Sequence, residues 1–590
     1  MYGYAGKILR VDLSKKRIRK EPLTLTRIKG FLGGDGFSTD ILFNESRPDL
    51  SWLSPDNKII FMTGPLTANT IMSSRYNVTS KSPLTGIWGQ SDAGGFFGPE
   101  LKCAGFDGIV IEGSSESPVL LYVSNGEAEV RSAKDYWGLT TTMTQEMIKK
   151  DFGKTAKAAC IGIAGENLVR FANIISDGSR AAGRCGLGAV MGLKKLKTIV
   201  AMGDHRVEIS DSEKLKTIEK EMIQQLKERM KTLHDYGTTG PSFEFMLQVR
   251  NLPIKNWSEN TWDPDIVKSI GYEAAEKSLL ITRRSACYKC PVGCEVNVLA
   301  KPDGSLPGTE CKMEYESVVA LGPLCLNGNM ETIVVAQSLC NDYGIDTIEA
   351  GTVIAFAMEC YERGIVTKKE TGLELPWGDD KTITTLIELI AKRRGFGDIL
   401  SKGVKGAAEK VGGGAIKYAM HVKGASIPMH DPRVHSPYMA MKYVTSPIGA
   451  YHELGFATPS FYGHIPPELT PEKIAQDTIF SQDLAEVVEC LIMCNFAFAK
   501  WTGGLEAKKY VPELLFAVTG IQSSYKKLLK IGSRIFNMKR DYNVRLGIDN
   551  SYDRLPERFT KTSRITEDGK KLDINMDSML SKYYELRNWK

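Results

Sequence analysis

The chain has 590 residues, of which 25% are charged and 42% hydrophobic, and its formal net charge is +6. This composition is typical of an ordinary globular protein, and the length predicts three or four domains. Because the net charge is small and the lysine-rich pieces are short, we expect no nucleic-acid partner.

Targeting signals and cysteine usage both favour the cytoplasm. The N-terminus lacks a basic segment followed by an apolar stretch, and no run of about 18 uncharged apolar residues occurs, so we expect neither a signal peptide nor a membrane span. Twelve cysteines in a chain of this length are too few for a disulfide scaffold. We therefore expect a cytoplasmic protein whose cysteines are thiols or metal ligands.

The first third of the chain predicts a β-rich domain. Short β-branched runs bounded by Gly or Pro recur there, namely KILRVDLS, KIIFMTGPLT, GIVIEG, PVLLYVS and TIVAMG. Such runs are typical of strands. We expect a β-rich N-terminal domain over residues 1–208, with a few helices.

Helical periodicity dominates from residue 209 onward. Segment 210–237 predicts a helix that Ser210 or Asp211 caps and that Gly237 ends. Further helices are expected at 330–343, 346–363 and 381–394.

A second change in sequence pattern separates a third part of the chain from the second. The glycine cluster at 411–415 and the proline-bearing segment 426–433 interrupt the helical pattern. We therefore expect two mostly α-helical domains, 209–420 and 421–590, and the α+β fold class overall.

Three cysteines lie within eight positions in CYKCPVGC: Cys287, Cys290 and Cys294. A C-x2-C pair is often a zinc site, but zinc sites usually add a second pair or histidines nearby. Three clustered thiolates and one remote thiolate are a usual arrangement for a [4Fe–4S] cluster, and Cys490 or Cys494 can supply the fourth. Zinc remains an alternative. We expect small buried core residues at Cys103, Cys160, Cys185, Cys340 and Cys360.

Several long blocks, in order along the chain, resemble the aldehyde:ferredoxin oxidoreductase family. They are YAGKILRVDLS, SPLTGIWGQSDAGGFFGPELKCAGFDGIVIEG, GRCGLGAVMGLKKLKTI, CYKCPVGC, MEYESVVALGP and NDYGIDTIEAG. The resemblance runs to about residue 500 and is nearest to the broad-specificity tungsten aldehyde oxidoreductases. It implies a tungsten bis-pyranopterin (tungstopterin) enzyme, in which the β-rich domain forms a saddle for the pterin and two helical domains cover it.

The resemblance also implies how the cofactors are held. The cluster lies beside the pterin, with Cys494 as its fourth ligand, and the two pterin phosphates face each other around one Mg²⁺. Glycine-rich turns let backbone N–H groups approach such anions, and arginines can pair with them. The residues implied for this role are Arg75, Asp92, Ala93, Gly94, Gly95, Arg184 and Gly186.

In this family two acidic motifs accept hydrogen bonds from the pterin amines. Both motifs depart from the family's pattern in this sequence. The first reads NDYGID, with Asn341 in the first acidic position and Asp346 in the last. An amide oxygen still accepts from a pterin N–H, but the adjacent Asp342 leaves the register of that contact open. The second reads ECLIMC, in which Glu489 and Met493 take the corresponding places. Helix-end and capping roles are the alternative for Asn341.

The catalytic pair implied by the resemblance is Glu316 and His452. The family's spacing back from the first acidic motif selects Glu316 over Glu314 in MEYES, and the histidine falls in TSPIGAYHELG. Buried beside a metal, a glutamate becomes an acid or base whose pKa is tuned by burial. His430 is a possible substrate-pocket residue. Surface or hydrogen-bonded positions are expected for His205, His234, His421, His435 and His464.

The expected function is oxidation of an aldehyde to a carboxylic acid, with electrons leaving singly through the cluster to ferredoxin or an iron–sulfur subunit. Two alternatives stay open: a class II benzoyl-CoA reductase-type subunit, whose relatives bring a cysteine to the metal, and a pterin-free electron-transfer or scaffold subunit. The family's homodimer bridges its subunits through a Glu-x-x-His iron site, but segment 331–344 contains no histidine. We therefore expect no such bridge and a small polyferredoxin-like partner instead.

Overall fold

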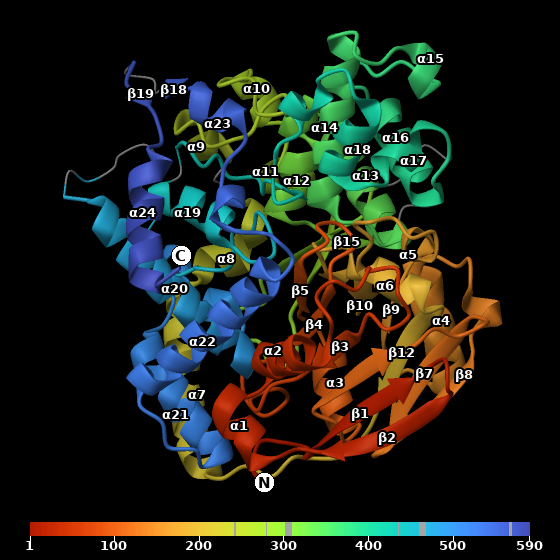
Figure 1. The fold of residues 1–590 in the computed structure, drawn as a ribbon, viewed down its shortest axis with the longest axis vertical. Coiled ribbons are helices and arrows are strands. Elements are labelled where there is room, and N and C mark those ends of the chain that lie inside the picture. The colour runs from red at the N-terminus through yellow and green to blue at the C-terminus, as the bar shows by residue number, and fades with distance from the viewer. Residues whose placement is uncertain are drawn as a thin grey trace.

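Two six-stranded sheets build the N-terminal part of the computed structural model (Figure 1). In the first sheet the strand order is β2-β1-β6-β3-β4-β5, and only β1 and β6 pair in parallel. Its strands are β1 Lys7–Asp12, β2 Arg17–Pro22, β3 Ile59–Met62, β4 Tyr76–Lys81, β5 Trp88–Ala93 and β6 Gly108–Glu112. Strands β3 and β4 are buried along their whole length, whereas the edge strand β2 is mostly exposed and charged.

The second sheet has the order β11-β10-β9-β12-β7-β8. Its strands are β7 Val119–Ser124, β8 Glu127–Ser132, β9 Lys157–Cys160, β10 Ile174–Ser176, β11 Arg180–Ala182 and β12 Leu196–Met202. Apolar side chains of both sheets belong to one buried cluster, so the two sheets share a core. The helices of this part are α1 Leu25–Phe31, α2 Gly34–Glu45, α3 Phe97–Cys103, η1 Lys134–Tyr136, α4 Thr141–Phe152, α5 Ile163–Glu166 and α6 Leu187–Leu193.

The middle of the chain is mostly helical and carries a small three-stranded sheet, β13-β14-β15. Its helices are α7 Ser212–Arg229, α8 Lys231–Tyr236, η2 Gly237–Thr239, α9 Phe243–Gln248, α10 Pro264–Val267, α11 Tyr272–Lys277, α12 Tyr315–Leu321, η3 Pro323–Cys325, α13 Met330–Tyr343, α14 Thr347–Glu362, α15 Lys368–Thr371, α16 Asp380–Lys392, α17 Phe396–Leu400, α18 Gly403–Val411 and η4 Ala415–Tyr418. Its strands are β13 Ile281–Ser285, β14 Glu295–Val298 and β15 Cys311–Lys312. The loop between β13 and β14 carries the three clustered cysteines.

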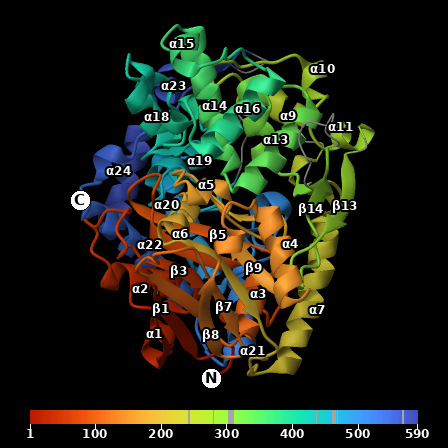
Figure 2. The same ribbon diagram turned by 90° about the vertical axis from the view of Figure 1, so that its right-hand side faces the viewer.

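The last part is again helical and lies beside both other parts (Figures 1 and 2). Its elements are β16 His421–Val422, β17 Ala425–Ser426, α19 Pro437–Thr445, α20 Pro471–Leu491, η5 Asn495–Ala497, η6 Lys500–Thr502, α21 Ala507–Thr519, α22 Tyr525–Val544, η7 Asn550–Tyr552, α23 Glu557–Lys561, β18 Arg564–Ile565, β19 Lys571–Leu572 and α24 Met576–Arg587. Helix α7 packs against α21 of this part through a shared apolar cluster. The structure describes residues 1–240, 243–278, 280–300, 310–434, 436–459, 466, 468–565 and 569–589.

A buried charge cluster ties α20 and α22 to the first sheet's helix α2. Lys539 on α22 lies 2.6 Å from Asp35 on α2 and 2.7 Å from Glu486 on α20, and all three side chains are fully buried. The ammonium also donates to Gln90 on β5 at 2.6 Å. One cation therefore fixes three elements around the end of α20, after which Cys494 follows.

The sequence-based elements compare well with these bounds. The α+β class, with a β-rich N-terminal part before a helical region, is confirmed. The helix expected over 210–237 is two helices, α7 and α8, since Met230 lies between them, and Asp211 caps the first by accepting from the N–H of Lys214 at 2.9 Å. Helix α13 has the predicted bounds.

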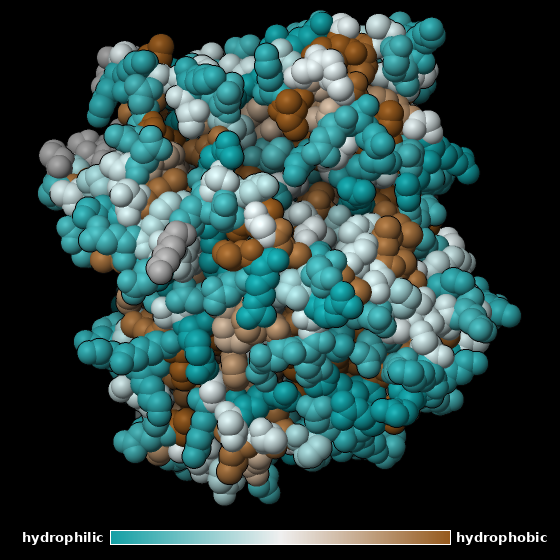
Figure 3. Space-filling view, in the orientation of Figure 1, coloured by the Kyte–Doolittle hydropathy of each residue, from teal (hydrophilic) through white to brown (hydrophobic). Residues whose placement is uncertain are grey.

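The visible surface is mainly hydrophilic. In Figure 3 hydrophobic residues form small separate areas among charged and polar ones. No helix within the described residues has the length and apolar character needed to cross a bilayer.

Candidate active site

A cavity of about 870 Å³ lies where the three parts of the chain meet, and most predicted site residues line it. Those on its wall are Arg75, Asp92, Ala93, Gly94, Arg184, Cys287, Cys290, Cys294, Glu316, Asn341, Asp346, His452 and Cys494. The remaining predicted residues, Gly95, Gly186, Glu489 and Met493, are not on the wall. Side chains from the sheets, the middle helices and the last helical part therefore share one space.

Four thiols converge on one side of this cavity. They are Cys287, Cys290 and Cys294 in the β13–β14 loop and Cys494 after α20. Burial raises the pKa of Cys290 to about 11 and that of Cys294 to about 12, so both stay neutral thiols at neutral pH unless a bound cation stabilises the thiolate. Cys490 is not on the wall; it is fully buried, and its sulfur lies 2.9 Å from where a Cβ on Gly36 would stand. The donor set fits a four-cysteine metal centre that excludes Cys490.

The glycine turn after β5 gives the cysteine loop room to approach. A Cβ on Gly94 would stand 2.9 Å from the sulfur of Cys287, and the N–H of Tyr288 donates to the carbonyl of Gly95 at 3.1 Å. The N–H groups of Phe96 and Phe97 donate to Asp177 at 2.7 and 3.0 Å. These two amides are thus bound within the protein, and the glycines serve the contact with the cysteine loop.

The two predicted arginines differ in how far the protein already engages them. Arg184 donates to the carbonyls of Ser426 and Ala450 at 2.6 and 3.2 Å and pairs with Asp346 at 3.2 Å. Arg75 is half-buried, and among the described residues its one ion pair is with Glu453 at 3.7 Å. Arg75 is therefore the cation more available to an anionic cofactor, whereas Arg184 joins the N-terminal part to the helical parts.

Glycine 186 has a packing role that explains why it is absent from the wall. It precedes α6 with φ +74°, and a Cβ there would stand 1.8 Å from the carbonyl oxygen of Arg170. No residue with a side chain fits this position. Its contribution to the site is to let the turn that bears Arg184 pack closely.

The two adjacent candidates of the first acidic motif, Asn341 and Asp342, lie in different surroundings. Asn341 lines the cavity at the end of α13, whereas the carboxylate of Asp342 is not on the wall and accepts from the hydroxyl of Thr142 at 2.5 Å. Asp346 is also on the wall and caps α14 by accepting from the N–H of Ile348 at 3.0 Å. Asn341 thus faces the cavity, although its amide is uncharged where the family motif has an acidic residue.

The second acidic motif lies behind the wall. Glu489 is buried and accepts from the amide of Gln90 at 2.5 Å, and burial together with the nearby Asp92 raises its pKa well above the ordinary value. Met493 is fully buried as well. In contrast, Asp92 is on the wall, and burial raises its pKa to about 6.

Glu316 stands in the first turn of α12 between two histidines. Its Oε1 lies 3.4 Å from Nε2 of His430 and 3.7 Å from Nε2 of His452, and its Oε2 accepts from the N–H of Met429 at 2.8 Å. Within the described part of the chain, Oε1 of Glu316 and Nδ1 of His452 are buried atoms without a hydrogen-bond partner. Glu314 is instead paired with Lys312 and accepts from Thr238 at 2.7 Å.

Burial sets the charge states of this trio. It raises the pKa of Glu316 to about 8, against the opposing N–H of Met429, and it lowers the pKa of His452 to about 3. The pKa of His430 is lowered well below its usual value by burial and then by His452. At neutral pH the trio therefore consists of a largely protonated carboxyl and two neutral imidazoles, and Glu316 is the member that can gain or lose a proton near this pH.

The remaining histidines and cysteines fit most of the expectations. His205 is exposed, His234 contacts the carbonyl of Val292 at 2.6 Å, and His421 accepts from the N–H of Gly424 at 3.3 Å. His435 and His464 lie outside the described residues. The expectation that Cys103 is fully buried is wrong, since it is only partly buried at the end of α3, whereas the other four expected core cysteines are buried.

Sequence reasoning missed four cations of the cavity wall, namely Arg180, Lys312, Lys442 and Lys500. Arg180 pairs with Glu295 beside the cysteine loop, and its place four residues before Arg184 is the signal that could have found it. Lys442 is 6% exposed and also lines the cavity. Its signal is a lone charge within the apolar run PYMAMKYV.

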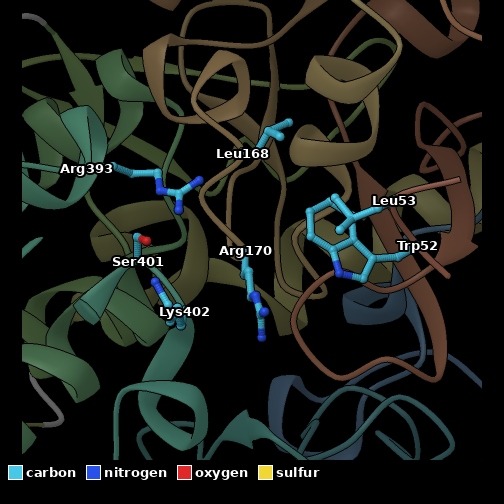
Figure 4. A pocket seen from close by; sticks show the side chains of 7 residues that line it. All are labelled: Trp52, Leu53, Leu168, Arg170, Arg393, Ser401 and Lys402. Atoms are coloured by element: carbon cyan, nitrogen blue, oxygen red, sulfur yellow. The ribbon is translucent and has the colours of Figure 1, made fainter. Parts of the chain in front are cut away.

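A second, smaller cavity of about 160 Å³ contains none of the predicted site residues. Figure 4 shows Arg170, Arg393 and Lys402 around this space, with Trp52 on its other side. Asp398 lies 2.7 Å from Arg393 and 3.0 Å from Lys402. The volume of this smaller cavity is too small for a pterin cofactor.

Four cysteines that share a cavity with a buried carboxyl and two histidines are a combination typical of metal-dependent oxidoreductases, which remove both electrons and protons from a substrate. The family described as aldehyde ferredoxin oxidoreductase matches the chain with its N-terminal domain at residues 8–203 and its domains 2 and 3 at residues 215–590. The chain belongs to this family, which confirms the resemblance seen in the sequence.

Named relatives agree with this assignment. The tungsten-containing aldehyde ferredoxin oxidoreductases of Pyrococcus horikoshii and Pyrococcus furiosus are each 37% identical to the chain, over 609 and 607 residues, and cover 100% of it and 97% of their own lengths. A solved structure described as the active site complex BamBC of benzoyl coenzyme A reductase matches with a TM-score of 0.87 and 26% identity, covering 100% of this chain and 95% of the other. The enzyme family is one of tungsten oxidoreductases and implies a tungstopterin cofactor.

Proposed function

We propose that this protein oxidises aldehydes to carboxylic acids. In the balanced reaction an aldehyde and one water give the acid, two protons and two electrons, and the electrons pass singly to an iron–sulfur acceptor. The observation that carries the proposal is the Glu316 carboxyl, whose free Oε1 lies 3.7 Å from His452 in the cavity that also holds the four thiols. Oxidation by oxygen transfer needs both a group that accepts the proton and a nearby redox centre that carries the electrons away.

The residues present fit the implied cofactors. We assign Cys287, Cys290, Cys294 and Cys494 to a [4Fe–4S] cluster, because their three-plus-one spacing is usual for that centre. Arg75 is available to an anionic group, and Asn341, Asp346 and Asp92 face the same space with groups that accept from N–H donors. Mg²⁺ would complete the assignment by balancing the charge of the cofactor's phosphates. When bound, the tungsten cofactor supplies the two-electron redox chemistry and polarises the substrate oxygen.

The protein's own groups bind, orient and move the proton. The N–H of Met429 holds one oxygen of Glu316 at 2.8 Å, which leaves the other oxygen free for the substrate side. With a pKa of about 8, this carboxyl exchanges a proton near neutral pH, where general catalysis is most effective. The neutral His452 can donate one hydrogen bond to the aldehyde oxygen. His430 stacks on Tyr315 with ring centroids 4.9 Å apart, which keeps it beside Glu316.

The electron acceptor in this proposal is ferredoxin or a small polyferredoxin-like subunit. Helix α13 has no histidine, so a Glu-x-x-His metal bridge between two copies would lack its histidine ligand there. One cubane stores one electron at a time, so a relay of further clusters suits a two-electron oxidation. Aromatic and basic side chains lie next to the cysteine loop, where Phe96 is 38% exposed and contacts Tyr288 and Lys157. None of the twelve cysteines, all of which lie within the described residues, forms a disulfide, which suits the reducing cytoplasm.

The alternative of a benzoyl-CoA reductase-type subunit has less support. The solved neighbour of that type is 26% identical to the chain, whereas the aldehyde enzymes are 37% identical. Such a subunit was expected to bring a further cysteine to the metal, and the described cavity wall has no cysteine beyond the four assigned to the cluster. A pterin-free scaffold would have no use for a cavity of about 870 Å³ with a buried acid–histidine trio.

Elemental analysis followed by turnover tests the proposal. We expect about one tungsten per chain, at least four irons, and reduction of a viologen dye by several aldehydes. A preparation with tungsten that oxidises no aldehyde, or one that holds iron and no tungsten or molybdenum, contradicts it.

Iron per tungsten in protein purified at native expression tests the partner. A value well above four together with a second small chain supports the iron–sulfur subunit. A lone homodimer with about four irons per tungsten contradicts it.

A further inference from the structure

Lys442 is a buried cation on the cavity wall that the proposed chemistry does not use. It lies on α19 with 6% of its surface exposed. The other buried or half-buried cations of the wall each have a carboxylate partner: Arg75 with Glu453, Arg180 with Glu295, Arg184 with Asp346 and Lys312 with Glu314. Across the part of the chain that the structure describes, Lys442 has no such ion pair or side-chain hydrogen bond. Lys500 is also on the wall, but it is exposed.

The fold holds the side chain of Lys442 in place. Every residue of α19 is buried, and Met439, one turn before Lys442, lines the cavity as well. The aliphatic stem runs along Gly455, where a Cβ would stand 3.3 Å from Cγ and Cε of the lysine. Gly455 has φ +111°, which other residues rarely adopt. The loop that carries His452 thus leaves room for this stem.

The ammonium lies on the reactive side of the cavity. After burial itself, Lys442 is the main cause that lowers the pKa of His452, and it also contributes to the lowered pKa of His430. Burial lowers the pKa of Lys442 to about 7. An ammonium buried without a partner costs several kcal/mol, so an anion that reaches this position regains a large interaction.

We propose that Lys442 binds an anionic group at the far end of the aldehyde, so that the enzyme prefers aldehydes bearing a carboxylate or a phosphate. This inference rests on the proposed aldehyde oxidation and adds a substrate class to it. Apolar side chains on the same wall suit the carbon chain between the two ends: Phe245, Met246, Met439 and Phe456. A carboxylate or phosphate group shares the negative charge and acceptor oxygens that an ammonium recognises.

Matched substrates test the preference. The ratio of kcat/KM for succinic semialdehyde to that for butanal measures the carboxylate's contribution at equal chain length, and glyceraldehyde 3-phosphate against glyceraldehyde measures a phosphate's. We expect the ratio for one of the two pairs to exceed 10 in the native enzyme. Lys442→Met should lower that ratio about 10- to 100-fold, the range for loss of a hydrogen bond to a charged group. The ratio cancels any effect on His452 that is common to both substrates.

Lys500→Met is the matched control, because Lys500 lines the same cavity at an exposed position. It should leave the ratio within about twofold. Lys442→Gln is the second variant, since it keeps polarity without charge and should lose the preference too. Equal losses in the Lys442 and Lys500 variants would show general attraction rather than a binding site. A native ratio near one for both pairs, or an unchanged ratio in Lys442→Met, overturns the inference.

Calorimetric titration of the resting holoenzyme separates this inference from the proposed function. Succinate should bind at least tenfold more tightly than butyrate to the native protein, or 3-phosphoglycerate than glycerate, and Lys442→Met should abolish the difference. If no aldehyde is oxidised but this selectivity is present, the proposed function fails and the anion site stands. If aldehydes are oxidised without selectivity in rate or binding, the anion site fails and the function stands.

Discussion

Replacing Glu316 by Gln removes the proton acceptor while keeping the shape of the side chain. The amide oxygen can still accept from the N–H of Met429, which now lies 2.8 Å from Oε2. Neither of its atoms can take up a proton near neutral pH. We expect kcat for aldehyde oxidation to fall about 10²- to 10⁴-fold, the usual contribution of a positioned general base, which corresponds to about 3–5 kcal/mol.

The pH dependence of the native enzyme should carry the same signature. Burial raises the pKa of Glu316 from 4.5 to about 8, and the base is the ionised form. The rate constant kcat/KM should therefore rise as the pH passes through about 8. This limb should disappear in Glu316→Gln.

The free energy of unfolding should fall as the pH rises towards 8, whereas the activity should rise. Between pH 4.5 and 8 the folded protein holds a proton on Glu316 that the unfolded chain has released, so stability falls as the pH rises through this window. At pH 7 the penalty is about 3 kcal/mol at 1.4 kcal/mol per pH unit. Glu316→Gln removes it, so the variant's thermal unfolding midpoint at pH 7 should exceed that of the native protein, and the difference should shrink towards pH 4.5.

A viologen-dye assay on preparations of measured tungsten and iron content distinguishes lost catalysis from lost cofactor. Glu314→Gln is the matched control, since Glu314 is on the same wall but paired with Lys312. Its kcat should fall less than that of Glu316→Gln. Native-like kcat in a fully metallated Glu316→Gln protein would refute the reasoning.

Three further outcomes follow from the site and its supports. His452→Asn should lower kcat about 10-fold or more with tungsten retained, as removal of a hydrogen bond to the reacting oxygen does; unchanged kcat contradicts this. Cys494→Ser should lose or weaken the iron–sulfur signal in electron paramagnetic resonance of the reduced protein, whereas Cys490→Ser should keep it, and the reverse result would make Cys490 the ligand. Lys539→Met leaves buried carboxylates without their cation, so it should destabilise the protein by about 3–5 kcal/mol in urea denaturation; a change below 1 kcal/mol contradicts this role.

The sequence determined the elements that depend on local pattern. Strand β6 appears where GIVIEG predicts it, and α13 has the expected bounds, because alternation, helical periodicity and terminal glycines act within a few residues. The cysteine spacing likewise favours a metal centre, and the family blocks identified the family. The sequence also selected Cys494, which the structure places on the cavity wall while Cys490 packs against α2.

Only the tertiary structure decided which groups meet and in what charge state. Arg75 and Arg184 look alike as arginines beside glycine turns, but Arg184 donates to the backbone carbonyls of Ser426 on β17 and of Ala450. Asn341 rather than Asp342 faces the cavity because of how α13 is turned against the sheets. The protonation of Glu316 depends on burial by residues more than a hundred positions away in sequence, such as Met429. The isolation of Lys442 depends on burial beside the loop that carries Gly455. Desolvation and long-range contacts have no local sequence pattern, so these properties appear only when the chain is folded.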